Sequence, residues 1–262
     1  MLFRSTNRTK LADYEKAFCE KTRMILRVHP SNYRIVGFTS IPTVRELSDL
    51  AHKHHSILFE DIGSGALIDL SQYGLTDEPV VSDSIRDGAD IVAFSGDKLL
   101  GGPQSGIIAG RRELIEKIRK HTLYRALRVD KLAYAALEAT LESYRRGTAI
   151  TDTPVLKMLA TTKDEIGART AKFVDGLGTN LRFEITDGRS AVGGGAAPLV
   201  QPETVLLALA HETLSAKELG EKLRNATPPV ITRIEDNKVL LDLRTVSEDE
   251  ETALLEILAS IN

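Results

Sequence analysis

The sequence is poor in cysteine and in aromatic residues. Cys19 is the only cysteine among 262 residues, and tryptophan is absent. An internal disulfide and a cysteine-based zinc cluster are therefore excluded, and a single thiol is typical of a reducing compartment. Because aromatic residues make up only 5% of the chain, a stacking platform for single-stranded nucleic acid is not indicated.

A strong net charge and long apolar segments are also missing. The formal net charge is −3, which argues against a basic coat that would bind DNA. No apolar run approaches the roughly 20 residues that a membrane-spanning helix needs. The first residues carry no apolar core of a signal peptide. We therefore expect a cytoplasmic protein that binds neither DNA nor a membrane.

Apolar runs alternate with helical patterns along the first half of the chain. The runs typical of buried strands are 24–28, 34–38, 56–61, 89–94 and 105–109. Apolar residues recur at helical spacing in 11–18, 43–51, 111–121 and 129–144. This alternation predicts an α/β fold with a largely parallel sheet.

The pattern breaks around residues 147–154, so we predict a domain boundary after residue 148. The two expected domains are 1–148 and 149–262. In the second domain we expect a helix over 154–176, strands near 181–185 and 204–210, and a helix over 215–225. A strand pair over 229–234 and 238–243 and a closing helix complete a small α/β domain.

A lysine-containing segment directly follows the predicted strand at 91–94. The segment is Ser95-Gly96-Asp97-Lys98-Leu99-Leu100-Gly101-Gly102-Pro103-Gln104. A buried strand delivers such residues to the carboxyl edge of the sheet, where open α/β proteins bind ligands. Lysine can form a Schiff base with an aldehyde, and a serine hydroxyl and glycine amides suit a phosphate. The pattern favours pyridoxal phosphate bound to Lys98, and a surface lysine in a turn is the alternative.

Two carboxylates extend this hypothesis. Asp61 also stands at a predicted strand end, where the sheet can bring it beside Lys98. A carboxylate there would keep the pyridine nitrogen of the cofactor protonated, or else Asp61 only caps the following glycine turn. Asp97 could exchange protons with the amine and the substrate, or it is a turn residue.

Basic residues outnumber acidic ones between residues 111 and 131, with eight lysines and arginines against three acids. A solvated helix face is the common explanation. Arg125 and Arg128 are three residues apart, however, so on a helical turn they can share a face and bind one oxyanion. This spacing favours an anionic substrate. A metal site at His52, His54 and His55 would need a carboxylate or a further histidine in suitable geometry, which the sequence does not indicate, so these histidines are interpreted as structural.

The sequence resembles the bacterial selenocysteine synthases, the L-seryl-tRNA(Sec) selenium transferases. The matching segments run through almost the whole chain: 31–39, 61–67, 95–104, 125–131, 137–141 and 229–231. The resemblance implies the large domain of a fold-type-I enzyme that depends on pyridoxal phosphate. In that arrangement Lys98 carries the cofactor, Asp61 contacts the ring nitrogen and Ser95 contacts the phosphate.

The same resemblance implies a substrate and a reaction. The family converts seryl-tRNA(Sec) to selenocysteinyl-tRNA(Sec) with selenophosphate, through loss of the serine hydroxyl to give an aminoacrylate and then addition of selenium. Asp97 would assist catalysis, and Arg125 and Arg128 would face the selenium donor. Active sites of this fold usually form between two subunits, so we expect at least a homodimer.

The chain is much shorter than members of this family. By comparison it begins inside their large domain, so we expect an N-terminally truncated member whose activity is impaired. One alternative is a pyridoxal-phosphate lyase or transferase that acts on a small amino acid or amino sugar. Another is a fragment that binds or assembles without turnover.

Overall fold

The computed structural model describes residues 7–33, 35–178, 181–193 and 195–261. Two compact units are present, one of residues 1–157 and 192–200 and the other of residues 158–191 and 201–262. The expected domain boundary after residue 148 stays a prediction. No helix within the described ranges is both long and apolar enough to cross a membrane.

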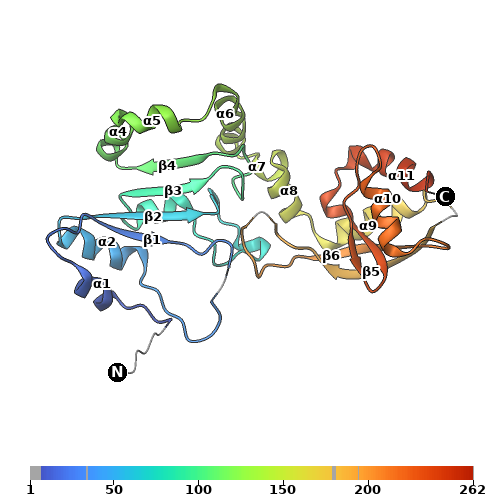
Figure 1. Ribbon diagram of the computed structural model, residues 1–262, viewed down its shortest axis with the longest axis horizontal. Helices are drawn as coiled ribbons and strands as arrows, with labels where there is room; N and C mark the ends of the chain where they lie inside the picture. The colour runs from blue at the N-terminus through green and yellow to red at the C-terminus, as the bar shows by residue number, and fades with distance from the viewer. Residues whose placement is uncertain (1–6, 34, 179–180, 194, 262) are drawn as a thin grey trace. The chain divides into compact units, whose positions relative to one another are not determined.

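The first unit contains a four-stranded sheet in the order β1-β2-β3-β4 (Figure 1). Its strands are β1 (Met24–Val28), β2 (Ile57–Gly63), β3 (Ile91–Ser95) and β4 (Gly106–Gly110). The first three strands are parallel, and β4 runs antiparallel to β3. The expected α/β class with a largely parallel sheet is therefore confirmed.

Helices precede, connect and follow these strands. They are α1 (Leu11–Ala17), α2 (Val44–Lys53), α3 (Val81–Arg86), α4 (Arg112–Lys120), α5 (Thr122–Leu127), α6 (Lys131–Arg146), α7 (Ala149–Asp152) and α8 (Pro154–Ala160), with a 3-10 turn at Ser71–Tyr73. Thr43 caps α2, and its side chain accepts a hydrogen bond from the Glu46 amide. In Figure 1, α1 and α2 lie by β1 and β2, whereas α4 to α6 lie by β4.

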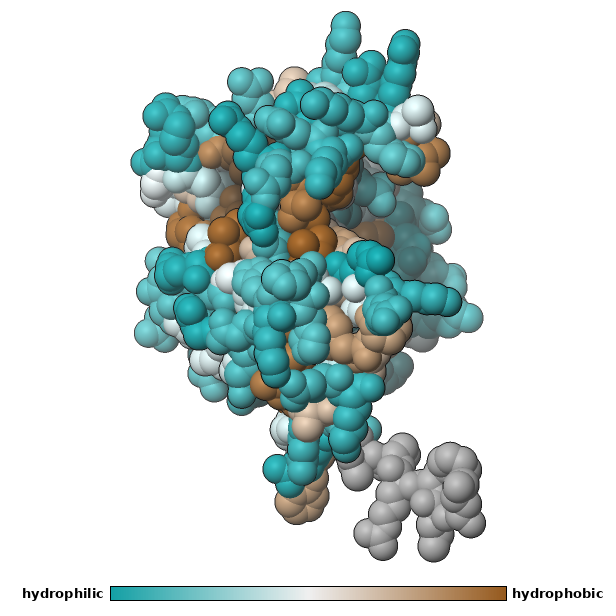
Figure 2. Space-filling model, turned by 90° about the vertical axis from the view of Figure 1, so that its left-hand side faces the viewer, coloured by the Kyte–Doolittle hydropathy of each residue, from teal (hydrophilic) through white to brown (hydrophobic). Residues whose placement is uncertain are grey.

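One face of this sheet is packed and the other is open. Ile25, Leu58 and Val92 join Leu47 of α2 in one core cluster. Side chains alternate between the faces of a strand, so Met24, Leu26 and Val28 of β1 point to the opposite face, where they are 45–58% exposed. Figure 2 shows apolar side chains, in brown, at the surface between hydrophilic ones.

The predicted strand at 34–38 is wrong. Arg34 lies outside the described residues, and residues 35–38 form no strand. Val36 and Phe38 are more than four-fifths exposed, and Gly37 has a positive φ of 118°. An apolar run becomes a strand only when a neighbouring strand offers hydrogen bonds, and no β pairing is described for these four residues.

The second unit is built on an antiparallel sheet in the order β5-β6-β8-β7. Its strands are β5 (Leu181–Arg189), β6 (Glu203–His211), β7 (Arg233–Glu235) and β8 (Lys238–Asp242). The accompanying helices are α9 (Lys163–Val174), α10 (Ala216–Arg224) and α11 (Glu251–Ala259), with 3-10 turns at Leu243–Thr245 and Glu248–Glu250. Ile166, Leu219 and Leu254 of these helices pack with Leu207 and Leu241 of the sheet.

Two expectations for this unit need correction. The helix predicted over 154–176 is two helices, because Thr162 and Glu165 form a reciprocal N-terminal cap that starts α9. The strand predicted over 229–234 is confined to β7. The prolines at 228 and 229 lack the amide hydrogens that a β ladder requires.

Candidate functional site

The carboxyl ends of β1, β2 and β3 lie at the same edge of the first sheet. Val28 pairs with Asp61, and Asp61 pairs with Ala93, so the residues that follow the three strands are neighbours. Hydrogen bonding between the two segments continues past the end of β1, because the His29 amide donates to the Asp61 carbonyl of β2 at 2.8 Å. The sheet thus brings the segment that follows β3 close to the ends of β1 and β2.

Lys98 is partly buried at this edge, with room around its amine. Its Nζ donates a hydrogen bond to Ser31 Oγ over 3.5 Å. A Cβ atom added at Gly63 would lie 3.9 Å from Nζ, and one added at Gly195 would lie 3.8 Å from it. Because both positions are glycines, the space that these two Cβ atoms would fill is left open beside the amine.

The loop that carries Lys98 closes on itself. The Gly101 amide donates to the Lys98 carbonyl at 3.0 Å, and the Gly102 amide donates to the Gly96 carbonyl at 2.7 Å. The expectation that glycine amides of this segment hold a phosphate is therefore wrong for Gly101 and Gly102, whose amides are used within the loop. The sequence shows that glycines make a turn here, but not that the turn uses both amides for its own closure.

Neighbouring elements hold the same loop from outside. The Leu99 amide donates to the Ser64 carbonyl at 2.9 Å, and the Tyr144 hydroxyl of α6 donates to the Leu100 carbonyl at 2.9 Å. Burial raises the pKa of Tyr144 to about 12. The position of Lys98 thus depends on both the β2 turn and α6.

Asp61, Ser95 and Asp97 occupy different places around Lys98. Asp61 is partly buried on β2, next to the strand that leads to the lysine. Ser95 is the last residue of β3, is partly buried and pairs with Gly106. Asp97 is exposed. Their roles as ring-nitrogen partner, phosphate contact and catalytic acid or base stay predictions.

Arg125 and Arg128 lie on the helical turn that their spacing indicates. Arg125 belongs to α5, and Arg128 is the residue that caps its C-terminus. Both are exposed. A hydrogen bond with Tyr124 of the same helix raises the pKa of Tyr134 on α6, so the two helices are in contact. Binding of an anion by this arginine pair stays a prediction.

Of the three histidines at the C-terminal end of α2, His52 in the last turn of the helix makes a structural contact. His52 Nε2 lies 2.9 Å from Asp90 Oδ2. Asp90 also accepts hydrogen bonds from Arg111 and from the Leu58 amide. Burial alone would raise the pKa of Asp90, but these hydrogen bonds lower it below its ordinary value. In the described residues, no three His, Cys, Asp or Glu side chains gather as a metal site.

Three residues near Lys98 were not predicted as site residues. Ser31 and Asn32 follow β1 much as Lys98 follows β3, and this shared position is the sequence signal that could have found them. Gly195 comes from the segment 192–200, which belongs to the first unit although β5 and β6 of the second unit flank it. A Cβ atom at Gly195 would lie 3.7 Å from Asn32 Cβ. No local sequence pattern predicts that the segment 192–200 lies beside Lys98.

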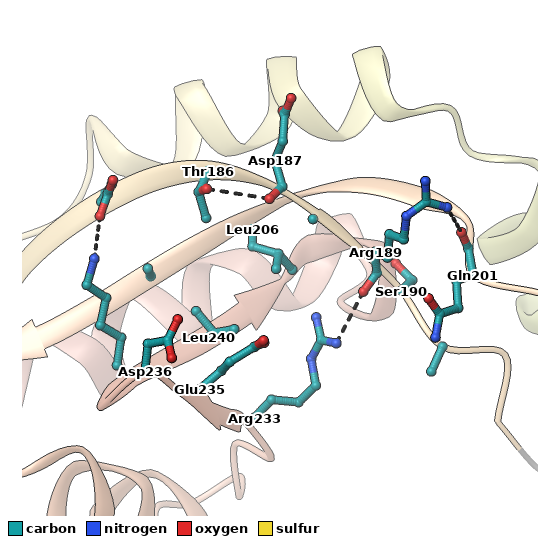
Figure 3. Close-up of a pocket in the computed structure, with 15 residues that line it drawn as sticks. Thr186, Asp187, Arg189, Ser190, Gln201, Leu206, Arg233, Glu235, Asp236 and Leu240 are labelled. Carbon is teal, nitrogen blue, oxygen red and sulfur yellow. Dashed lines mark hydrogen bonds and ion pairs between the residues drawn. The ribbon is translucent and has the colours of Figure 1, made fainter.

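A second hollow of about 470 Å³ lies on the second unit (Figure 3). Leu206 and Leu240 lie beside it, and Lys238 forms an ion pair with Glu184 across it over 2.5 Å. The Arg233 guanidinium donates to the Arg189 carbonyl. Cationic and acidic side chains alternate in the lining, so its charge favours neither an anion nor a cation.

The α/β fold of this chain is similar to that of a solved structure of D-glucosaminate-6-phosphate ammonia-lyase. The TM-score is 0.60 and the identity 21%, over 98% of this chain and 62% of that chain. This likeness shows the fold. The SelA family model, described as L-seryl-tRNA selenium transferase, matches residues 3–247. The chain belongs to this family.

Curated relatives agree with the family match. L-seryl-tRNA(Sec) selenium transferase of Alkaliphilus metalliredigens is 48% identical over 261 residues, which cover 98% of this chain and 56% of the relative. The enzyme of the same name from Desulfotalea psychrophila is 44% identical over 259 residues, covering 97% and 56%. The chain therefore spans about half the length of the curated relatives it matches.

Proposed function

We propose that this chain carries the lysine-bearing part of a pyridoxal-phosphate enzyme that converts seryl-tRNA(Sec) to selenocysteinyl-tRNA(Sec) with selenophosphate. The observation that supports it most is the Lys98 amine at the sheet edge, in a chain that belongs to the selenium transferase family. The relatives' names supply the tRNA substrate. Selenophosphate, a small anion, suits the predicted arginine pair.

The residues around Lys98 fit pyridoxal phosphate. A primary amine is available for the aldehyde, and the space beside it would be filled if Gly63 or Gly195 had a side chain. When bound, this cofactor withdraws electrons from the substrate α-carbon, which allows the serine hydroxyl to leave. Asp61 would then hold the proton on the ring nitrogen, and Ser95 would bind the phosphate.

The other predicted residues act on the substrates. Asp97, exposed beside Lys98, would move protons between the amine and the substrate. Arg125 and Arg128 would bind the selenium donor through charge-assisted hydrogen bonds. We further propose at least a homodimer, in the cytoplasm, as the setting in which these residues work.

Turnover by the purified chain tests this function. With pyridoxal phosphate and selenophosphate, seryl-tRNA(Sec) should yield selenocysteinyl-tRNA(Sec), and Lys98→Ala should abolish the product. Arg125→Ala and Arg128→Ala should raise KM for selenophosphate while cofactor absorbance stays unchanged. Turnover of free serine or an amino sugar but not of seryl-tRNA would indicate a lyase or transferase of small substrates. Cofactor absorbance without any turnover would indicate a non-catalytic fragment.

A further inference from the structure

A buried histidine–glutamate pair lies next to the lysine site. His29 Nε2 is 3.5 Å from Glu78 Oε2, and the two side chains are only 9% and 3% exposed. His29 is the first residue after β1, and Glu78 lies in the segment that leads to α3. Neither residue has a role in the function proposed above.

Such a pair is unusual as a purely stabilising feature. Removing two ionisable groups from water is costly, and their mutual attraction often only offsets that cost. A buried pair of this kind, next to a candidate ligand site, is therefore a candidate for holding an atom of that site in place. The neighbours of His29 show which atom that is.

A short series of contacts leads from the pair to Lys98. The Ser31 amide donates to the His29 carbonyl at 2.8 Å, which folds residues 29–31 into a tight turn. This turn buries Ser31, and its Oγ accepts the hydrogen bond from Lys98 Nζ. A Cβ atom at Gly63 would lie 2.9 Å from the same Oγ, so the hydroxyl is closely confined.

We propose that His29 and Glu78 are positioning residues for Lys98, and that they act through Ser31. The pair fixes the turn after β1, and the turn holds the Ser31 hydroxyl against the lysine amine. The Lys98 side chain is thereby kept in one orientation at the sheet edge. The importance of this orientation rests on the proposed function, but the contacts themselves do not require a cofactor.

Chemical labelling of Lys98 in the cofactor-free chain tests the proposal. Reductive methylation with formaldehyde and cyanoborohydride is followed by peptide mapping, with the other lysines of the chain as internal references. The hydrogen bond holds the amine against Ser31, so Ser31→Ala should release it and speed its methylation roughly two- to fivefold, the factor for a hydrogen bond of about 0.5–1 kcal/mol. His29→Gln and Glu78→Gln should act in the same direction.

Two matched controls separate positioning from general loss of stability. Ser48→Ala removes another buried serine hydroxyl, which donates to the Gly88 carbonyl. His52→Gln breaks another histidine–carboxylate pair in the same unit. Both controls should leave the methylation rate of Lys98 relative to the other lysines unchanged.

A double substitution gives the decisive result. If the pair acts through the Ser31 hydroxyl, His29→Gln should add nothing to the methylation rate in the Ser31→Ala background. Additive effects in the double variant, or an unchanged rate in Ser31→Ala, would overturn the proposal. If the labelling follows this scheme while pyridoxal phosphate fails to attach to Lys98, the positioning stands and the proposed function fails.

Discussion

Replacing Gly65 by alanine tests whether the lysine loop depends on a close approach of two main chains. Gly65 has a φ of +73°, and a Cβ atom there would lie 2.3 Å from the Ser95 carbonyl oxygen. Gly147, which follows α6, has nearly the same φ of +75°, and no heavy atom of the described chain comes within 4 Å of its Cβ position. An alanine at either position would therefore carry the same backbone strain, but only the alanine at Gly65 would clash with a neighbouring atom.

The two substitutions should differ in magnitude accordingly. Placing alanine in the left-handed region costs about 1–2 kcal/mol, and this applies to both sites. Forcing an atom against a packed main chain adds about 1–3 kcal/mol. We expect Gly147→Ala to lower the free energy of unfolding by about 1–2 kcal/mol and Gly65→Ala by about 2–5 kcal/mol.

Tyrosine fluorescence measures this difference in the first unit alone. The chain has six tyrosines and no tryptophan, and every tyrosine precedes residue 158. Urea unfolding followed by tyrosine emission therefore reports the first unit, whatever the second does. Equal losses of stability in the two variants would refute the close approach of Gly65 to Ser95.

Three further substitutions test polar contacts that stabilise the two units. Tyr144→Phe removes the hydrogen bond to the Leu100 carbonyl and should lower the unfolding free energy by about 1 kcal/mol, measured by urea unfolding; an unchanged midpoint would contradict it. Asp90→Asn should cost about 1–3 kcal/mol at pH 7. Because the pKa of Asp90 is lowered in the folded state, this loss should be complete above the ordinary aspartate pKa of about 4 and should disappear as the pH falls through the lowered value. A loss that persists at low pH would contradict this. Arg244→Lys, which breaks a buried fork onto Ser190 Oγ and the Glu203 carbonyl, should destabilise the second unit by about 2–4 kcal/mol in circular dichroism, with the tyrosine transition unchanged.

Much of the fold could be predicted from local patterns. The apolar runs at 24–28, 56–61 and 89–94 became the parallel strands, because a buried strand needs little more than continuous apolar residues and polar ends. Lys98 and Asp61 were placed at the sheet edge for the same reason. The strand prediction over 34–38 was wrong because an apolar run alone does not supply a partner strand.

The rest of the site depended on contacts between distant segments. Ser31 lies 67 residues before Lys98 along the chain, and Gly195 reaches it from a loop between two strands of the other unit. The hydrogen bonds that occupy the amides of Gly101 and Gly102 likewise depend on how the loop closes. A single sequence shows which hydrogen-bond donors and acceptors are present, but it does not show which donor pairs with which acceptor in the folded chain.

Borohydride reduction of the chain mixed with pyridoxal phosphate, followed by peptide mapping, tests the central claim most directly. The proposed function predicts that the reduced cofactor is found on the peptide that contains Lys98. It also predicts that the label and the visible absorbance both disappear in Lys98→Ala. Labelling of a different lysine, or an absorbance band that survives in that variant, would contradict it.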